Sequence, residues 1–301
     1  MTMRIFMNEI LTAHPECDRR TLLPTLAAIH VSIALLCSLL LTSRVMAQAN
    51  AGIEELPYAR AAIEATGYQG TMLLYDLNRE QYYAANAGNV TQAHIPASTF
   101  KIMSSLIAIE AGLVATADTV LPWDGVTRGR TATNADLTLR DAFQLSSVPH
   151  YQALVRAVGA PAMQRALSDI AYGNQNISGG IDQFWLTGEL RISPAQQISL
   201  LRRLHDEQLP FSTDTMQTVK DIMVIESGED YVLRAKTGLA ISEDDRHTGW
   251  WVGWVEHDGN VTFFATVLTA TAPDSGFIPA RLSVTRDVLH ELEVLPAATH
   301  N

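Results

Sequence analysis

The sequence predicts an α+β fold: an antiparallel five-stranded sheet flanked by helices, with an all-helical subdomain inserted at about residues 113–227. Three observations support this prediction. Strand-like segments occur in two groups, one near residue 75 and one after residue 230. The segment between the two groups has mostly helical spacing. A helical pattern precedes the first group and follows the last, and such terminal helices can cover the face of a sheet.

Before the insertion, the elements follow the order helix, hairpin, helix. The segment 54–66 has apolar residues at helical spacing and stops before Gly67, a residue type that often ends a helix. The segments 70–75 and 81–84 are rich in aliphatic and aromatic residues and flank a polar turn, so we expect them to pair as strands. A second helix is expected over 98–111.

The insertion is expected to consist of short helices, two of which have clear start signals. Thr138 is placed to cap a helix over 139–145. Ser193 and Pro194 begin a helix that runs to about residue 207, because serine suits the N-cap and proline suits the first turn. Two further helices are expected at 151–158 and 161–170.

After the insertion the sheet resumes and a helix closes the chain. The expected strands are 231–236, 249–255 and 261–269. Residues 256–260 contain the pair Asp258-Gly259, which is typical of a hairpin turn between the last two strands. A final amphipathic helix is expected over about 279–292.

Residues 1–47 are expected to be a signal peptide with an extended N-terminus, and residues 48–301 a single domain. Arg19 and Arg20 precede an apolar run over 22–41, and small residues precede a cleavage site after Ala47. This pattern predicts export to the periplasm, with membrane contact only through the leader. An uncleaved anchor stays open, since about 20 apolar residues can span a bilayer. Both cysteines lie in the leader, so the domain contains no disulfide and no thiol nucleophile.

Charge and histidine spacing exclude two classes of function. The net charge of −11 argues against a nucleic-acid partner, which usually requires a basic face. The nine histidines are scattered, and none has the His-x-His or His-Glu-x-x-His spacing of a metal hydrolase. We therefore expect neither a metal nor a nucleic-acid partner. The sequence does not indicate an oligomeric state.

A serine and a lysine three residues apart are the first candidates for chemistry. Ser98 and Lys101 lie at the start of the helix expected over 98–111, so that spacing places them on one face. An unprotonated amine could take the serine proton, and the helix N-terminus disfavours the ammonium form. A Ser-x-x-Lys also occurs about once in a chain of this length by composition alone. However, Lys101 is one of only three lysines, and an arginine could not serve as a base.

Three further motifs each have an ordinary structural explanation when taken alone. Lys236-Thr237-Gly238 is expected to end the strand 231–236, where Gly238 gives close access to the backbone. Ser146-Ser147-Val148 and Tyr172-Gly173-Asn174 complete the set, and the second could be a simple turn. Ser-x-x-Lys and Lys-Thr-Gly together are typical of penicillin-recognising serine enzymes.

Taken together, the motifs resemble the class D, or oxacillinase-type, serine β-lactamases. The resemblance covers essentially all of the chain after the leader. The matching stretches are Pro96-Ala97-Ser98-Thr99-Phe100-Lys101, Ser146-Ser147-Val148-Pro149, Tyr172-Gly173-Asn174, Phe184-Trp185-Leu186 with Gly188 and Ile192-Ser193, Lys236-Thr237-Gly238, and Gly249-Trp250-Trp251-Val252-Gly253-Trp254.

The resemblance implies the fold of the penicillin-recognising transpeptidases and β-lactamases, and catalytic roles for four residues. Ser98 would attack the lactam carbonyl. Lys101 would be N-carboxylated by carbon dioxide, and the carbamate would act as the base. Ser146 and Lys236 would relay a proton to the leaving nitrogen. No other cofactor is implied.

Further residues would form the surroundings of these four. Trp185 would donate its indole N–H to the carbamate, which Val148 and Leu186 would shield from water. The substrate would be held by Thr237, Gly238, Leu239 and Arg281, with the backbone N–H groups of Ser98 and Leu239 as the oxyanion hole. Tyr172 and Asn174 are expected to shape the cleft. His150, beside the Ser146 motif, could line the cleft but is more often structural.

The implied function is hydrolysis of penicillins and related β-lactams through a serine acyl-enzyme, which confers antibiotic resistance. Two alternatives share the fold and motifs: a cell-wall transpeptidase or carboxypeptidase, and a β-lactam sensor domain. The Phe184-Trp185-Leu186 stretch favours the hydrolytic class. The preferred β-lactams depend on segments 113–136 and 240–247, which lie outside the matched motifs.

Overall fold

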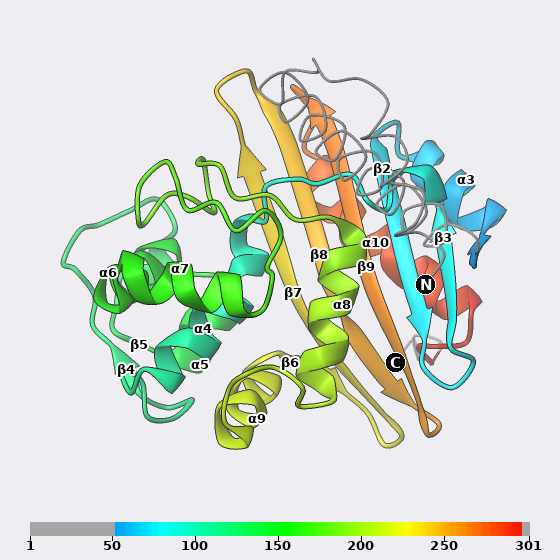
Figure 1. Ribbon diagram of the computed structural model, residues 1–301. Helices are drawn as coiled ribbons and strands as arrows, with labels where there is room; N and C mark the ends of the chain where they lie inside the picture. The colour runs from blue at the N-terminus through cyan, green and yellow to red at the C-terminus, as the bar shows by residue number, and fades with distance from the viewer. Residues whose placement is uncertain (1–51, 297–301) are drawn as a thin grey trace, which may run out of the picture. The chain divides into compact units, whose positions relative to one another are not determined.

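The computed structural model describes residues 52–296 (Figure 1). The expected signal peptide therefore lies outside the described residues. The helices are α3 Pro57–Ala65, α4 Lys101–Glu110, α5 Leu139–Gln144, α6 Val148–Val158, α7 Ala160–Asp169, α8 Pro194–His205, α9 Thr213–Ile222 and α10 Phe277–Glu291, with 3₁₀ turns η1 Ala87–Asn89, η2 Ala97–Phe100 and η3 Thr131–Thr133. None of the helices between residues 52 and 296 is long and apolar enough to cross a membrane.

The main sheet has seven strands in the order β1-β3-β2-β9-β8-β7-β6. The strands are β1 Ile53–Glu55, β2 Gln69–Asp76, β3 Gln81–Ala85, β6 Val224–Ser227, β7 Tyr231–Ile241, β8 Arg246–His257 and β9 Asn260–Thr271. A separate pair consists of β4 Val120–Leu121 and β5 Leu137–Thr138. The α+β class is confirmed, but the prediction of five antiparallel strands is wrong: the sheet is mixed, because β1 pairs with β3 in parallel.

The two additional strands lie at the edges of the sheet, and each is too short to show a period-two pattern. β1 occupies residues that were expected to start a helix. Glu55 is held in the strand because its carboxylate accepts hydrogen bonds from the backbone N–H groups of Asn86 (2.8 Å) and Ala87 (3.0 Å). The helix then begins only at Pro57, in the first turn, where proline is favoured. β6 falls inside the expected helical insertion and pairs with β7 across a β-bulge.

Both faces of the sheet are buried, and one hydrophobic core lies on each side of it. Trp250, Val252 and Trp254 of β8 point into one core, whereas Trp251 and Val255 point into the other. Alternation along a strand produces this division, and strands buried on both faces are apolar throughout. Figure 1 shows α8 on one face, with α3 and α10 on the other.

The predicted hairpin and helix starts are confirmed. Asp258 and Gly259, with φ of 49° and 70°, connect β8 to β9 as the two-residue turn requires. Thr138 accepts a hydrogen bond from Asp141 N at the start of α5. Ser193 and Gln196 form a reciprocal capping box at the start of α8. These local signals place the starts of α5, which precedes Ser146, and of α8, which carries Gln197.

Candidate active site

Ser98 lies on the 3₁₀ turn η2, which continues directly into α4. Ala97 before it has a φ of 49°, an uncommon conformation for a residue with a side chain. The turn is held from two sides: the Trp250 indole N–H donates to the Ile95 carbonyl (2.9 Å), and the Gln197 amide donates to Thr99 Oγ1 (2.9 Å). Ser98 retains 8% exposure. The nucleophile candidate is thus fixed in place and still reachable.

Lys101 is fully buried one helical turn from the serine. Its Nζ lies 2.9 Å from Ser98 Oγ, within hydrogen-bond distance, and 5.1 Å from the centre of the Tyr151 ring. Burial, together with the positive charge of Arg130, lowers the Lys101 pKa from 10.5 to about 7. A substantial fraction of this amine is therefore unprotonated at neutral pH and can act as a base or a nucleophile toward carbon dioxide.

The turn carrying Ser98 packs against β7 at Gly238. A Cβ at this position would lie 2.9 Å from the Pro96 carbonyl oxygen and 3.2 Å from Thr99 Cγ2, so only glycine allows the approach. The Lys236-Thr237-Gly238 motif was expected to end a strand, and this prediction is wrong: β7 continues to Ile241, paired with β8 along its whole length. The motif therefore lies within the strand, opposite the serine turn.

Lys236 and Ser146 meet across 90 residues of sequence. Lys236 Nζ donates to Ser146 Oγ at 3.0 Å and to the Thr237 carbonyl at 3.1 Å. Burial, together with the positive charges of Lys101, Arg281 and Arg130, lowers the Lys236 pKa well below 10.5. Ser146 has a φ of 53°, in the left-handed region that costs a residue with a side chain about 1 kcal/mol or more. This serine–lysine pair can pass a proton.

Trp185 is buried at 1% exposure, and its indole nitrogen has no hydrogen-bond partner among the described residues. The ring lies against Phe100, the neighbour of Lys101 in sequence, at a centroid distance of 5.6 Å. A buried indole N–H normally finds an acceptor. Val148, the first residue of α6, and Leu186 are both half-buried. The indole N–H is thus a buried donor beside Phe100 with no acceptor among the described residues.

Arg281 is buried on α10, at 6% exposure, rather than lying on the helix surface. Its Nε donates to the Trp250 carbonyl (3.1 Å) and its Nη1 to the Ile278 carbonyl. Burial lowers the Arg281 pKa from 12.5 to about 10. The positive charge of Arg281 in turn helps to lower the pKa of Lys236. Thr237 and Leu239 are half-buried on β7. A cationic centre thus lies beside this strand.

Tyr172 and Asn174 have different environments. Tyr172 is buried edge-to-face on Phe100, with ring centroids 5.5 Å apart, and burial raises the pKa of its hydroxyl. Asn174 is exposed and bonds to backbone: its amide donates to the Glu189 carbonyl (2.8 Å), and its oxygen accepts from Arg191 N (3.0 Å). Tyr172 supports the serine turn, whereas Asn174 links two surface segments.

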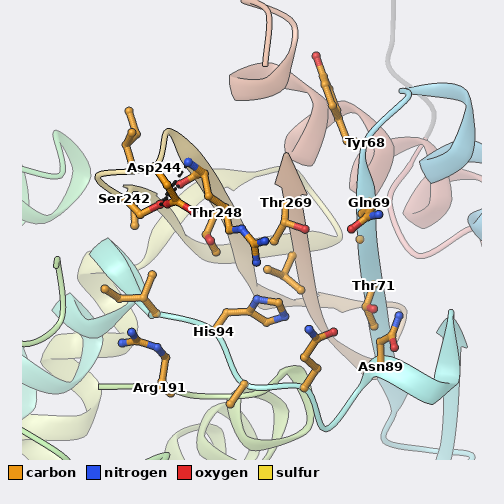
Figure 2. Close-up of a pocket in the computed structure, with 18 of the residues that line it drawn as sticks. Tyr68, Gln69, Thr71, Asn89, His94, Arg191, Ser242, Asp244, Thr248 and Thr269 are labelled. Carbon is orange, nitrogen blue, oxygen red and sulfur yellow. Dashed lines mark hydrogen bonds between the residues drawn. The ribbon is translucent and has the colours of Figure 1, made fainter. Parts of the chain in front are cut away.

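A cavity of about 1190 Å³ opens beside the serine rather than around it. Figure 2 shows it between Gln69 and Thr71 of β2 and the segment that includes Ser242, with His94 near the centre of the view. Leu186 and residues 240–241 line it as well, so it adjoins the Trp185 segment and β7. Ser98 and Lys101 are not among its lining residues.

In the described part of the chain, one group of three side chains could hold a metal ion: Asp230, His257 and Asp258. Asp230 directly precedes β7, His257 is the last residue of β8, and Asp258 follows it in the turn to β9. None of the residues predicted for the candidate active site belongs to this group.

Three contributors to the site were not predicted from the sequence. Gln197 is fully buried on α8 and reaches Thr99, Arg130 lies on the loop between β4 and β5, and Tyr151 lies beneath Lys101. Gln197 acts on the serine turn and the other two act on Lys101, each from a distant part of the chain. No local pattern in the sequence marks them.

Comparisons with known proteins agree with this geometry. The model of the penicillin binding protein transpeptidase domain matches residues 67–290. Beta-lactamase OXA-48 of Klebsiella pneumoniae is 41% identical over 228 residues, which are 76% of this chain and 85% of that protein. The chain belongs to the class D serine β-lactamases. Beta-lactamase OXA-10 of Pseudomonas aeruginosa is 39% identical over 67% of this chain and 76% of its own length.

Solved structures place this enzyme in the same family. The class D β-lactamase YbXI from Nostoc has 40% identity and a TM-score of 0.75, covering 79% of this chain and 99% of that one. FUS-1 (OXA-85) of Fusobacterium nucleatum has 35% identity and a TM-score of 0.77, covering 80% and 100%. The implied fold of penicillin-recognising enzymes is thereby confirmed. Class D serine β-lactamases need no metal cofactor.

Proposed function

We propose that this enzyme hydrolyses the amide of β-lactam antibiotics through an acyl-enzyme on Ser98, with N-carboxylated Lys101 as general base, and so confers resistance. The observation that supports this most strongly is the buried Ser98–Lys101 pair. Its atoms lie 2.9 Å apart, and burial brings the lysine pKa to about 7. A serine becomes a useful nucleophile only when a neighbouring base takes its proton.

The surroundings of Lys101 fit a carbamate on Nζ. Carboxylation requires the free amine, which burial favours. The indole N–H of Trp185 is a buried donor that has no acceptor among the described residues, and a carbamate oxygen would supply one. When present, the carbamate supplies a base that accepts the Ser98 proton and later a proton from water. Val148 and Leu186 would limit access of water to it.

The remaining residues would divide the reaction between them. Ser98 Oγ forms the bond to the lactam carbonyl, and the backbone N–H groups of Ser98 and Leu239 stabilise the oxyanion. As the C–N bond breaks, the leaving nitrogen takes a proton from the Ser146 hydroxyl, which Lys236 replenishes over their 3.0 Å hydrogen bond. The proton taken from Ser98 then replaces the one that Lys236 gave up. In the second step water attacks the ester, its proton passes through the base to Ser98 Oγ, and Ser98 is released.

Substrate binding is assigned to the cationic side of β7. β-Lactams carry a carboxylate next to the scissile ring. The Thr237 hydroxyl would donate a hydrogen bond to that carboxylate, and the buried Arg281 would supply the positive charge. Gly238 leaves the backbone open to the substrate. Tyr172 would support one side of the cleft, with Asn174 shaping its rim.

Turnover combined with intact mass tests this function. The purified enzyme is mixed with a chromogenic cephalosporin in bicarbonate buffer. We expect many turnovers and no lasting adduct. One turnover with a stable adduct on Ser98 would contradict hydrolysis, and would indicate instead a cell-wall peptidase or a β-lactam sensor.

We further propose that residues 1–47 direct export to the periplasm and are removed after Ala47. The basic, apolar and small-residue segments of the sequence support this. Mass spectrometry of the protein from a periplasmic extract should give a chain that begins at Gln48. A chain that retains the apolar run and stays in the membrane fraction would show an anchor instead.

A further inference from the structure

His150 is a buried histidine in α6 that the proposed mechanism does not use. It is 3% exposed and lies two residues after Val148. Its Nε2 is 3.1 Å from the Ala135 carbonyl, and its Nδ1 is 2.7 Å from Ser147 Oγ. The ring therefore joins two segments: the loop between β4 and β5, and the turn that carries Ser146.

The two contacts define the protonation state of the ring. A carbonyl only accepts hydrogen bonds, so Nε2 must carry a proton and donate to Ala135. In the neutral ring Nδ1 is then an acceptor, and the Ser147 hydroxyl donates to it. An imidazolium would donate from Nδ1 as well, and the Ser147 hydroxyl, at 1% exposure, would need a different acceptor.

The Ser147 hydroxyl does not cap its helix. Ser147 is the N-cap residue of α6, where a serine oxygen normally accepts from a backbone N–H of the first turn. No such capping bond forms, and the hydroxyl bonds to the His150 ring instead. The histidine contact thus replaces a stabilising helix cap, directly beside the strained Ser146.

The other end of the contact reaches a loop that acts on both catalytic lysines. The loop over residues 122–136 is held together by internal interactions. These include the Asp124–Arg128 ion pair and the hydrogen bond that Trp123 N donates to the Asp136 carboxylate. Arg130 of this loop lowers the pKa of Lys101 and of Lys236. His150 connects the body of the enzyme to this loop at Ala135.

We infer that neutral His150 is a positioning residue: its contact with Ser147 holds the Ser146–Ser147 turn, and with it the Ser146 hydroxyl within reach of Lys236, while its contact with Ala135 fixes the 122–136 loop. This rests on the proposed proton relay through Ser146. Three charged residues of the loop act on the His150 ring: Asp124 and Asp136 favour the imidazolium, and Arg128 opposes it. On the side of α4, Lys101 and Ser105 contact Tyr151, the residue after His150. Burial is the largest influence and lowers the His150 pKa below 6.5.

Two isosteric substitutions separate the two contacts. His150→Asn places an amide oxygen near Nδ1 and can still accept from Ser147. His150→Gln reaches Ala135 with its amide N–H but leaves Ser147 without that acceptor. We expect His150→Asn to keep kcat and raise KM, because only the loop contact is lost. His150→Gln should keep KM and lower the acylation rate about five- to tenfold, the effect of one hydrogen bond.

Ser147→Ala is the matched variant, because it removes the same bond with a smaller change. It should lower acylation as His150→Gln does, and the double variant should be no worse than either single one. The pH profile provides a second readout. As pH falls through the His150 pKa, the wild-type acylation rate should fall more steeply than that of His150→Asn, whose side chain does not titrate.

The outcomes separate the inference from the mechanism beneath it. Acylation rates and pH profiles equal to wild type in His150→Gln and Ser147→Ala would overturn the inference, even if Tm fell. Ser146→Ala tests the relay: if it blocks acylation while those two variants do not, only the role of His150 is wrong. If Ser146→Ala acylates normally, the relay itself is wrong.

Discussion

At the scale of single residues, burial controls the chemistry of Lys101. An ammonium inside the protein loses its hydration, and no carboxylate of the described residues forms an ion pair with Nζ to compensate. The amine therefore releases its proton near pH 7 instead of near 10.5. Lys220 is a contrasting lysine at 9% exposure, because it forms a 2.9 Å ion pair with Glu207.

This contrast predicts opposite outcomes for two alanine variants. Lys101→Ala should lower kcat/KM by about 10²- to 10⁴-fold, the range for loss of a general base. Lys220→Ala should keep kcat/KM within about twofold, because its ion pair lies outside the proposed machinery. Steady-state kinetics with a penicillin checks both. Equal losses in the two variants would show that lysine removal acts through folding rather than through chemistry.

The Lys101 pKa also predicts a pH dependence. Carbon dioxide reacts with the free amine, and the fraction of free amine falls about tenfold for each unit below the pKa. Activity in buffer with limited carbon dioxide should therefore decline as pH falls below about 7, and added bicarbonate should restore part of it. A pH series with and without bicarbonate measures this. Activity that stayed level down to about pH 5 under limiting carbon dioxide would contradict the expectation.

The indole N–H of Trp185 is expected to stabilise the carbamate on Lys101 by one hydrogen bond. Trp185→Phe keeps an aromatic ring against Phe100 and removes the indole N–H. A hydrogen bond to a charged group contributes about 1.5–3 kcal/mol, so the bicarbonate concentration for half activity should rise about 10- to 100-fold. Trp254→Phe is the control, because it removes a buried indole N–H that bonds to Glu256. Equal bicarbonate requirements in all three proteins would exclude this role for Trp185.

At the scale of elements, the close contact of η2 with β7 brings the serine and the Lys236 motif together. Gly238 makes this contact possible, because a side chain there would collide with the Pro96 carbonyl. Trp250 on β8 and Gln197 on α8 then hold the turn from two further directions. The geometry of Ser98 thus depends on three elements that are distant in sequence.

Gly238→Ala should separate η2 from β7. The added carbon would lie 2.9 Å from a backbone oxygen, which cannot move aside as a flexible side chain can. We expect a loss of about 1–3 kcal/mol in the free energy of unfolding and slower acylation. Gly88→Ala is the control, because no atom lies within 4 Å of its Cβ position. Thermal unfolding and acylation rates compare them, and a Gly238→Ala enzyme with wild-type values would disprove the close contact.

The sequence predicted those elements whose signals are local. The hairpin at Asp258-Gly259 and the caps at Thr138 and Ser193 occur as expected, because each depends on a few neighbouring residues. β1 was missed because its conformation depends on pairing with β3 and on hydrogen bonds to a turn more than 30 residues away. β7 was predicted too short because glycine usually weakens a strand.

The same distinction applies to the candidate site. Helical spacing alone predicts that Ser98 and Lys101 meet, whereas the contact of Lys236 with Ser146 followed only from the family resemblance. Gln197 and Arg130 carry no motif, and their positions depend on the packing of the whole fold. His150 stood beside a motif, but only the structure shows which atoms it joins.

At the scale of the whole molecule, the sheet and the helical insertion each contribute part of the site. Strand β7 of the sheet provides Lys236 and Thr237. The helices and turns that face this strand provide Ser98, Lys101 and Ser146. Figure 1 shows β7 as the strand beside the helices α4 to α7. Burial at this junction lowers the pKa of both Lys101 and Lys236, which suits proton transfer during acyl transfer from an anionic amide.

The most direct test of this account measures the carbamate itself. The enzyme is freed of carbon dioxide, assayed, and then supplied with ¹³C-bicarbonate while its NMR spectrum and activity are followed together. We expect low activity at first, and then a carbamate resonance that grows in parallel with recovered activity and is absent in Lys101→Ala. Full activity without carbon dioxide, and no carbamate resonance after bicarbonate is added, would contradict the proposal that Lys101 is the carboxylated base.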